Sequence, residues 1–473
     1  MSLLISGATV IDGNAERPIE GQSIWIEAGR IKAIGRHDQM AVPSSIKVLD
    51  ARGKYVIPGL MDANVHLMGD VRIEQLVRYE GRYEELILES AQVALKSGLT
   101  SVFDTWGPRM ALMAVRDNIS SGKTVGSRIF CAGNIIGLDG PISPDFLPKV
   151  VGLVSNSLVE RINSLYAENV GPDLTWMVPQ QVAEEVRAYL RTGIDFIKYA
   201  SNEHRGGEPN AFLLFSPLVQ SHIVEEAHRA GTTAQAHATS VEGIRVAIEA
   251  GSDILQHCNL SGPVPIPEET LELLAKRKTG AVLFPLTERR LEIFKKVDVM
   301  TRRFWSTADI NCRALIGSGV PLLLGTDQSL LASDIGSDPS MKNNPIAVNE
   351  DNLFELGQGH FHWLTAMEEK GCPPMRILKA ATRNIAVAYG KDQDLGSLEQ
   401  GKIADMLILS GNPLQAAKNY RAIQTIIKDG QIVDTEALPI NPILTKPTAP
   451  ASDTASSYGR FAPSRYPFCC GSM

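Results

Sequence analysis

The chain has 473 residues, and its 46 Lys and Arg stand against 53 Asp and Glu, which gives a formal net charge of −7. This length is too great for one small domain and sufficient for a barrel with an accessory domain. The mildly acidic balance, without blocks of like charge, gives no electrostatic support for nucleic acid or an anionic membrane as partner. A small-molecule partner is therefore expected.

The six cysteines are scattered through apolar contexts, apart from the terminal pair Cys469 and Cys470, and they form no Cys-X-X-Cys ligand set. Reduced thiols in the cytoplasm are the simpler interpretation. The sequence shows no export signal and no unbroken apolar run of roughly 18 residues. We therefore expect a cytoplasmic protein without a membrane-spanning segment.

Both ends of the chain predict short antiparallel strands. Residues 1–58 alternate short β-branched runs with Gly-containing turns, and residues 400–440 repeat this pattern. We expect the two ends to pair into one small β-sandwich domain. Residues 59–399 must then form a compact insertion whose own termini lie close together.

The insertion alternates short apolar runs with longer amphipathic stretches, several of which finish on Gly as a helix C-cap does. The eight apolar runs are YVIPGLMDANVHL, LTSVFDTW, SRIFCAGNII, IDFIKYAS, TTAQAHA, DILQHCNL, GAVLFPL and VPLLLGTDQ. Eight strand-helix units predict an α/β fold of the TIM-like (β/α)8 type. Residues 441–473 are rich in Pro, Ser and Ala and predict a tail, either disordered or draped on a neighbouring molecule.

Polar side chains fall at the ends of five of the predicted strands, where the functional groups of such a barrel gather. They are Asp62, Asn64 and His66 on the first strand, Lys198 on the fourth, His237 on the fifth, His257 on the sixth and Asp327 on the eighth. Three imidazoles and a carboxylate at one barrel mouth are typical ligands of a divalent metal ion. Lys198 alone allows a plainer interpretation, an ion pair with Asp104 or Asp62.

Other histidines are interpreted differently. His360 and His362 also spell His-X-His, but they lie in a predicted helix, where residues two apart point away from each other, and we expect them to be structural. His204 and Arg205 follow the fourth strand in a Gly-rich loop, which makes them candidate substrate contacts.

Aromatic residues near the predicted mouth favour an uncharged, partly apolar substrate, with Trp106 and Tyr199 as contacts. The alternative is that these rings only pack the rim of the barrel.

The motifs PGLMDANVH, GIDFIKYAS, TTAQAHA, ILQHCNL and LLLGTDQ, with the closing segment KAATRNIAVAYGKDQDLGSLEQGKIADMLILSGNPL, resemble the metal-dependent amidohydrolase superfamily over residues 1 to about 435. The resemblance implies a first metal held by His66, Lys198 and Asp327, and a second held by Lys198, His237 and His257. It also implies that Lys198 is carboxylated to bridge them, and that the metal is zinc or cobalt.

Asn64 departs from this pattern, because most members carry the first His of His-X-His there. An amide oxygen is a weaker ligand than imidazole, so one metal per chain is an alternative to two, and Lys198 then need not be carboxylated. Asn-X-His in this setting is similar to a small subgroup that contains molinate hydrolase and the phenylurea hydrolases.

The resemblance implies hydrolysis of a urea, carbamate, thiocarbamate or amide, as in herbicide degradation, with Asp327 as general base. Two alternatives stay open. A prolidase-like or dipeptidase-like enzyme would need a cation for a substrate carboxylate, which Arg205, Arg289 or Arg290 could supply. A noncatalytic binding protein could use the same fold. For all of these interpretations we expect a homo-oligomer.

Overall fold

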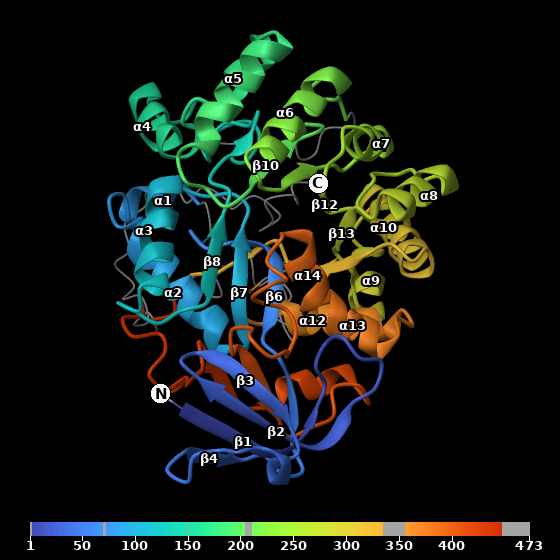
Figure 1. Ribbon diagram of the computed structural model, residues 1–473. Coiled ribbons are helices and arrows are strands. Elements are labelled where there is room, and N and C mark those ends of the chain that lie inside the picture. The colour runs from blue at the N-terminus through green and yellow to red at the C-terminus, as the bar shows by residue number, and fades with distance from the viewer. Residues whose placement is uncertain (1, 70–71, 149, 204–210, 334–354, 447–473) are drawn as a thin grey trace, which may run out of the picture.

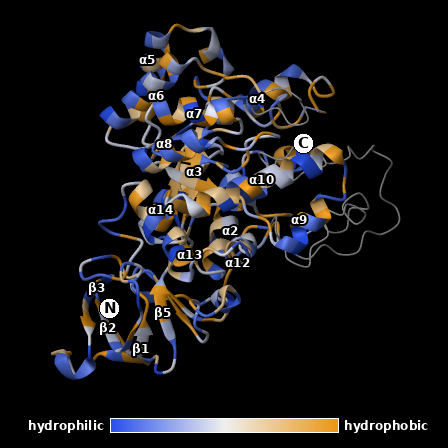
Figure 2. Cartoon of the chain, turned by 90° about the vertical axis from the view of Figure 1, so that its right-hand side faces the viewer, coloured by the Kyte–Doolittle hydropathy of each residue, from blue (hydrophilic) through white to orange (hydrophobic). Residues whose placement is uncertain are grey.

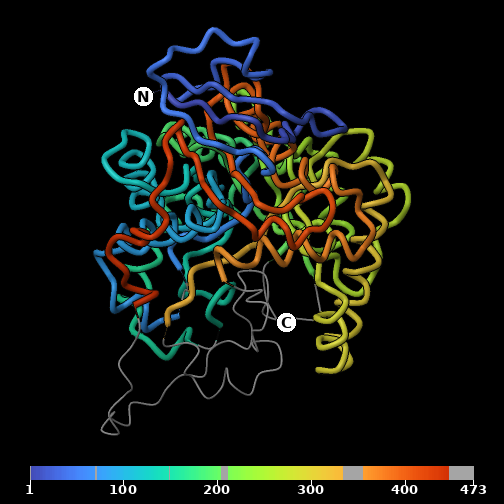
Figure 3. Tube along the Cα trace, turned by 90° about the horizontal axis from the view of Figure 1, so that it is seen from below, coloured from blue at the N-terminus to red at the C-terminus, as the bar shows by residue number. Residues whose placement is uncertain are grey.

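The computed structural model describes residues 2–69, 72–148, 150–203, 211–333 and 355–446. It is an α/β fold in which a (β/α)8 barrel is inserted in a sheet domain built from both ends of the chain (Figure 1). The blue N-terminal strands and the orange-red C-terminal strands lie side by side in Figures 1 and 3, as the sequence predicts.

The sheet domain has eight strands in one hydrogen-bonded sheet, in the order β18-β17-β16-β5-β1-β2-β3, with β4 paired to β1. They are β1 (Ser2–Val10), β2 (Ile19–Glu27), β3 (Arg30–Gly35), β4 (Lys47–Asp50), β5 (Tyr55–Pro58), β16 (Met406–Leu409), β17 (Ile423–Lys428) and β18 (Gln431–Ile432). The two chain ends meet where β5 pairs antiparallel with β16, with Ile57 opposite Leu407. The domain has a small hydrophobic core of its own, which includes Ile5, Ile24 and Met406.

The barrel strands are all parallel to their neighbours. They are β6 (Leu60–His66), β7 (Leu99–Asp104), β8 (Arg128–Cys131), β9 (Ile135–Ile136), β10 (Ile197–Ala200), β11 (Ala234–His237), β12 (Ile254–Gln256), β13 (Gly280–Leu283), β14 (Leu322–Leu324) and β15 (Gln328–Ser329). The third predicted run supplies both β8 and β9, and the eighth supplies β14 and β15. Because β15 pairs with β6, the eighth position returns to the first.

The helices surround these strands. They are α1 (Ile73–Arg78), α2 (Tyr83–Lys96), α3 (Arg109–Ser120), α4 (Asn156–Ala167), α5 (Pro179–Leu190), α6 (Pro217–Arg229), α7 (Val241–Glu249), α8 (Glu268–Arg277), α9 (Glu288–Phe294), α10 (Val299–Gly317), α12 (Gly359–Glu369), α13 (Pro374–Ala380) and α14 (Arg383–Ala388). Hydrophilic and hydrophobic residues alternate along them, as expected of amphipathic helices that cover a core (Figure 2). Of the helices in the described residues, none has the length and apolar character needed to cross a membrane.

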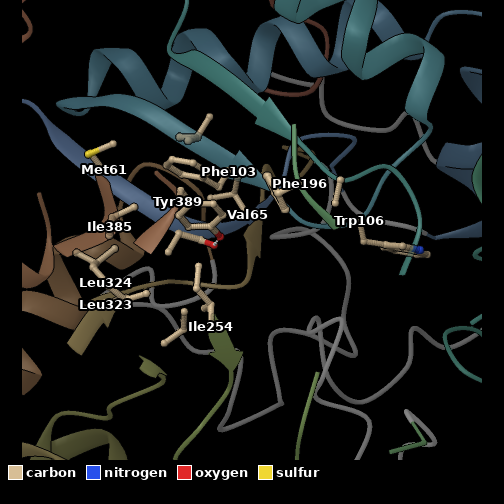
Figure 4. Close-up of a cluster of buried hydrophobic side chains, with 14 of the residues drawn as sticks. Met61, Val65, Phe103, Trp106, Phe196, Ile254, Leu323, Leu324, Ile385 and Tyr389 are labelled. Atoms are coloured by element: carbon tan, nitrogen blue, oxygen red, sulfur yellow. Dashed lines mark hydrogen bonds between the residues drawn. The ribbon is translucent and has the colours of Figure 1, made fainter. Parts of the chain in front are cut away.

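Large side chains fill the inside of the barrel (Figure 4). The ring of Tyr389, which follows α14, stacks on Phe103 of β7 with 3.8 Å between ring centroids, and it meets Phe196 edge-on at 5.0 Å. Aromatic pairs in these geometries add to the stabilisation that burial gives. The barrel is therefore a packed core, and only its mouth is available for chemistry.

The described part of the predicted tail, residues 441–446, is bound to the barrel of the same chain. The buried carboxylate of Glu89 on α2 accepts hydrogen bonds from the backbone N–H groups of Ile443, Leu444 and Thr445, each at 2.8 or 2.9 Å. The rest of the predicted tail lies outside the described residues.

Gly59, between β5 and β6, connects the sheet domain to the barrel. A Cβ at this position would lie within 2.8 Å of the Thr100 Cβ on β7 and would overlap the rest of that side chain. We expect Gly59→Ala to lower the free energy of unfolding by about 1–3 kcal/mol, because overpacking a buried contact forces the backbone to shift.

Chemical denaturation measures this change. Gly317→Ala is the control, since nothing lies within 4 Å of a Cβ there and the residue ends helix α10. A Gly59→Ala protein as stable as wild type would contradict the close packing at the junction.

Candidate active site

The predicted strand-end residues meet at the mouth of the barrel. Asn64 and His66 lie on β6, Lys198 on β10 and His237 on β11; His257 directly follows β12, and Asp327 lies between β14 and β15. All six are buried, and His66, at 5 %, is the most exposed.

Asp327 is the point at which these side chains converge. Its Oδ1 lies 2.9 Å from His66 Nε2 and accepts a hydrogen bond from Asn64 Nδ2 at 3.0 Å. Its Oδ2 lies 4.0 Å from His257 Nδ1 and, within the described residues, accepts no hydrogen bond. The ring of His237 completes the group, with its centroid 5.3 Å from that of His257.

The surroundings keep Asp327 ionised. Burial by itself would raise the pKa of this carboxyl, but the imidazoles of His257 and His66 and the amine of Lys198 hold the pKa well below its ordinary value. A buried carboxylate with one unsatisfied oxygen needs a cation or a proton donor nearby.

His66 is oriented from behind. Its Nδ1 lies 3.2 Å from the carbonyl oxygen of Trp106, and because a carbonyl only accepts, Nδ1 carries a proton. With Nδ1 protonated, Nε2 faces the carboxylate of Asp327 either with its lone pair, in neutral imidazole, or as an N–H donor, in imidazolium. Two such groups stay 2.9 Å apart only when a cation, either a proton or a metal ion, is shared between them.

A chain of hydrogen bonds joins Asn64 to Lys198. The Thr105 hydroxyl donates to Asn64 Oδ1, and Lys198 Nζ lies 3.1 Å from the same Thr105 oxygen. Both ends of the Asn64 amide are thus hydrogen-bonded, because its nitrogen donates to Asp327. Among the described residues Lys198 forms no close ion pair with Asp62 or Asp104, although its charge does act on Asp104, whose pKa it lowers.

Asp62 ties the first barrel strand to the eighth. Its carboxylate accepts hydrogen bonds from the backbone N–H of Asn64 at 3.0 Å, from that of Thr326 at 3.1 Å and from the Thr326 hydroxyl at 2.7 Å. Asp104 similarly accepts from the N–H of Leu67, which follows His66, at 2.7 Å. Burial raises the pKa of both carboxyls to about 7.

Sequence reasoning missed this anchoring role. The sequence does carry one signal for it. Asp62 stands two residues before Asn64, and an Asp side chain commonly accepts a hydrogen bond from the backbone N–H two residues further on.

The backbone is unusual at two of these positions. His257 and Asp327 both have a φ of 55°, in the left-handed region that residues other than Gly adopt uncommonly, although Asn, Asp and His do so more often than most. The N–H of Asp327 donates to the carbonyl of Asn64 at 2.8 Å, which helps to hold this conformation. Such strain gathers at functional sites, where surrounding contacts impose it.

The prediction that Tyr199 contacts substrate is wrong. Successive residues of a strand point to opposite faces, and Tyr199 lies behind β10, with its hydroxyl 2.7 Å from Ser252 Oγ and 3.2 Å from Gln220 Oε1 on α6. The hydroxyl is therefore hydrogen-bonded behind the sheet, to α6 and to the loop before β12.

Trp106 packs the rim of the barrel. Its ring is 2 % exposed, stacks on Phe146 at 4.0 Å and donates its indole N–H to Asn134. The ring is therefore covered, which contradicts the predicted substrate contact. It agrees with the alternative that Trp106 only packs the rim of the barrel. The other two predicted contacts, His204 and Arg205, lie outside the described residues.

The side chains at the mouth are of the types that bind a divalent ion, and they lie close to one another. In the described part of the chain, no three His, Cys, Asp or Glu side chains form a group arranged to hold a metal ion. Yet the site combines neighbouring imidazoles with a buried carboxylate oxygen that lacks a hydrogen bond.

The helical His-X-His pair is structural, as predicted. His360 Nε2 lies 3.2 Å from the carbonyl of Ser97, and His362 Nε2 accepts from the N–H of Thr287 at 3.3 Å. Both rings are buried on α12, and burial lowers the pKa of each to about 3.

The sequence matches the amidohydrolase family over residues 55–433. Two solved structures are similar over nearly the whole chain. Molinate hydrolase has a TM-score of 0.89 at 35 % identity and covers 96 % of this chain and 99 % of its own. Phenylurea hydrolase B has a TM-score of 0.89 at 32 % identity, with 95 % and 100 % covered.

More distant relatives act on other compounds, as their names state. Ochratoxinase of Aspergillus niger is 26 % identical over 399 residues, which are 80 % of this chain and 75 % of that protein. Imidazolonepropionase of Geobacillus thermodenitrificans is 26 % identical over 442 residues, which are 88 % and 91 %. A Xaa-Pro dipeptidase has the same fold, with a TM-score of 0.69 at 22 % identity over 92 % of this chain and 100 % of its own.

The buried pair His360 and His362 should make stability depend on pH. Because folding lowers each pKa from near 6.5 to about 3, the unfolded chain binds protons in this interval that the folded chain does not. Stability therefore falls as pH decreases through it. In the double variant His360→Asn, His362→Asn, we expect the free energy of unfolding to change less steeply between pH 6.5 and 5, by up to about 1.4 kcal/mol per pH unit for each histidine.

Urea denaturation at several pH values measures both slopes. His37→Asn, at an exposed position, is the control and should keep the slope of wild type. Equal slopes for the double variant and wild type would show that these two rings are not held neutral.

Proposed function

The chain belongs to the amidohydrolase family, and on that premise we propose that it is a divalent-metal-dependent hydrolase of a urea, carbamate, thiocarbamate or amide. The family assignment supports a hydrolase that acts on carbon–nitrogen bonds. The observation that carries the proposal is the contact of the Asp327 carboxylate with His66 and His257 at the barrel mouth.

Amidohydrolases generally bind divalent metals, and we propose one zinc or cobalt ion per chain, held by His237, His257 and Asp327 and supported by His66. Asn64 favours one ion over two, because its amide is hydrogen-bonded at both ends and its oxygen is a weak ligand. A single ion needs no bridging carbamate, so Lys198 would remain an amine. When bound, the ion supplies a Lewis acid that polarises a carbonyl and makes water more acidic.

Asp327 is the proposed general base. The neighbouring imidazoles and amine hold its pKa low, so it is ionised at neutral pH. Because a low pKa also makes it a weak base, it would accept the proton of the attacking water only where the bound ion has made that water more acidic. The same carboxyl can then deliver that proton to the leaving nitrogen or sulfur. His66 holds one oxygen of Asp327, which leaves Oδ2, the oxygen without a hydrogen bond in the described residues, to face the reactants.

The substrate class is proposed from similarity and from polarity. Two structures that cover at least 95 % of this chain at 32–35 % identity are a molinate hydrolase and a phenylurea hydrolase, so herbicide-like ureas and thiocarbamates are the leading candidates. Phe284, buried directly after β13, lines a small hollow with Gly325 and Thr326 next to Asp327, and an apolar ring there suits an uncharged substrate.

Asp327→Asn tests the mechanism. Because an amide cannot accept the water proton, we expect at least a 10³-fold loss of kcat with zinc still bound through His237 and His257. Steady-state kinetics and metal analysis of the same preparation measure both. The matched control is Asp309→Asn on α10, a carboxylate paired with Lys370 outside the site, which should retain wild-type kcat. Wild-type turnover in Asp327→Asn would refute its role as base.

The substrate class is tested by comparing a neutral phenylurea, a dialkyl thiocarbamate and an Xaa-Pro dipeptide on the purified full chain with zinc or cobalt. We expect kcat/KM for one of the two neutral compounds to exceed that for the dipeptide at least 100-fold. A preference for the dipeptide would favour the prolidase-like alternative. No metal after growth with zinc or cobalt, together with no turnover, would favour a binding protein.

A further inference from the structure

The first barrel strand is irregular at the residues that lead into the site. The register of β6 against β7 shifts between Asp62 and Val65, so Ala63 and Asn64 form a bulge outside the regular ladder. A bulge frees backbone groups from their usual partners, and in a buried strand those groups need others. Ala63 and Asn64 are both fully buried.

Two side chains satisfy the carbonyl of Ala63. The hydroxyl of Tyr389 donates to it at 2.6 Å, and Gln256 Nε2 donates at 3.3 Å. Gln256 directly precedes His257 in the chain. One carbonyl oxygen therefore connects the strand of Asn64 and His66 with the strand that leads to His257.

Tyr389 is held firmly enough to act as a fixed donor. Its ring packs against both Phe103 and Phe196 inside the barrel (Figure 4). The helix that precedes it, α14, is anchored below the first and eighth barrel positions. Within α14, Asn384 Nδ2 donates to the carbonyl of Leu322 at 3.1 Å, and just before it the carbonyl of Ala381, at the end of α13, accepts from the N–H of Met61 at 2.9 Å.

We propose that Tyr389 is a positioning residue whose hydroxyl holds the β6 bulge and thereby sets His66 and, through the Asn64 peptide, Asp327 for the divalent ion. The inference rests on the proposed function. Asn64 follows Ala63 directly, and its own carbonyl accepts the N–H of Asp327 at 2.8 Å. A shift of the Ala63 peptide would therefore move His66 on β6 and, through the Asn64 carbonyl, Asp327.

The hydroxyl is the stronger of the two restraints. Without it, Gln256 at 3.3 Å is the side-chain donor that the described residues still offer to this buried carbonyl, and an undersatisfied buried carbonyl drives local rearrangement. Residues that orient metal ligands from behind typically change metal affinity 10–100-fold when replaced. Tyr389 is such a residue, because its hydroxyl acts through the backbone of β6 and would not touch the ion.

Tyr389→Phe removes the hydroxyl and keeps the ring stack. Tyr83→Phe is the matched control, because Tyr83 is also a buried tyrosine that donates to a backbone carbonyl, that of Leu76 at 2.9 Å, but near α1 and α2. Two quantities are measured on the full chain. Hydrogen–deuterium exchange of peptides covering residues 60–67 follows the bulge in metal-free protein, and competition with a chromogenic chelator gives the Kd for zinc.

In Tyr389→Phe we expect faster exchange over residues 60–67 and a Kd for zinc raised about tenfold or more. Tyr83→Phe should leave both within about twofold of wild type. Gln256→Met, which removes the weaker donor at similar volume, should change both in the same direction but less.

Wild-type exchange and affinity in Tyr389→Phe would overturn the inference, as would changes of the same size in Tyr83→Phe. Faster exchange with unchanged zinc affinity would also overturn it, because the bulge would then not position the ligands. A wild-type chain that binds neither zinc nor cobalt would sink the proposed function. Exchange over residues 60–67 would still show whether the hydroxyl holds the bulge.

Discussion

Closure of the barrel between its first and eighth positions is the constraint on which the site depends. Three groups of backbone and side-chain bonds make this closure: β15 pairs with β6, Asp62 accepts from Thr326, and the N–H of Asp327 donates to the carbonyl of Asn64. Asp327 lies within this seam, so its strained φ and its contact with His66 follow from how the barrel closes. Stability and site geometry are thus coupled at one edge, because the same bonds serve both.

Much of the fold could be predicted because its signals are local and periodic. Eight apolar runs separated by amphipathic stretches predicted the barrel, and the strand-like patterns at both ends predicted that they pair, as β5 and β16 do. Strand ends also located Asn64, His66, His237, His257 and Asp327 at a common mouth, because parallel strands place their C-terminal ends together.

What the sequence could not predict depends on side-chain direction and on partners distant in the chain. Tyr199 lies next to Lys198, and only its place on the opposite face of β10 shows that it cannot reach the mouth. Tyr389 gives no polar signal in the apolar stretch NIAVAYG; its importance comes from the bulge 326 residues earlier in the chain, whose carbonyl it caps. The Thr105 bridge between Asn64 and Lys198 likewise joins three separate strand ends.

Electroneutrality links the number of metal ions to the state of Lys198. Among the described residues at the mouth, three buried carboxyls (Asp62, Asp104 and Asp327) stand against one amine, so their formal charges sum to −3 + 1 = −2 with every carboxyl ionised. Burial raises the pKa of Asp62 and Asp104 to about 7, and a divalent cation nearby would favour their ionised forms. One divalent ion brings this sum to zero. A carbamate on Lys198 would make it −3 − 1 = −4, which two divalent ions would balance. Uncompensated charge in a buried site is costly. One ion with a carbamate would leave a charge of −2, and two ions with a free amine would leave +2, so both combinations are disfavoured. Asn64 favours the first of the two balanced states, one ion with a free amine. Its amide is already hydrogen-bonded at both ends and would be a poor ligand for another ion.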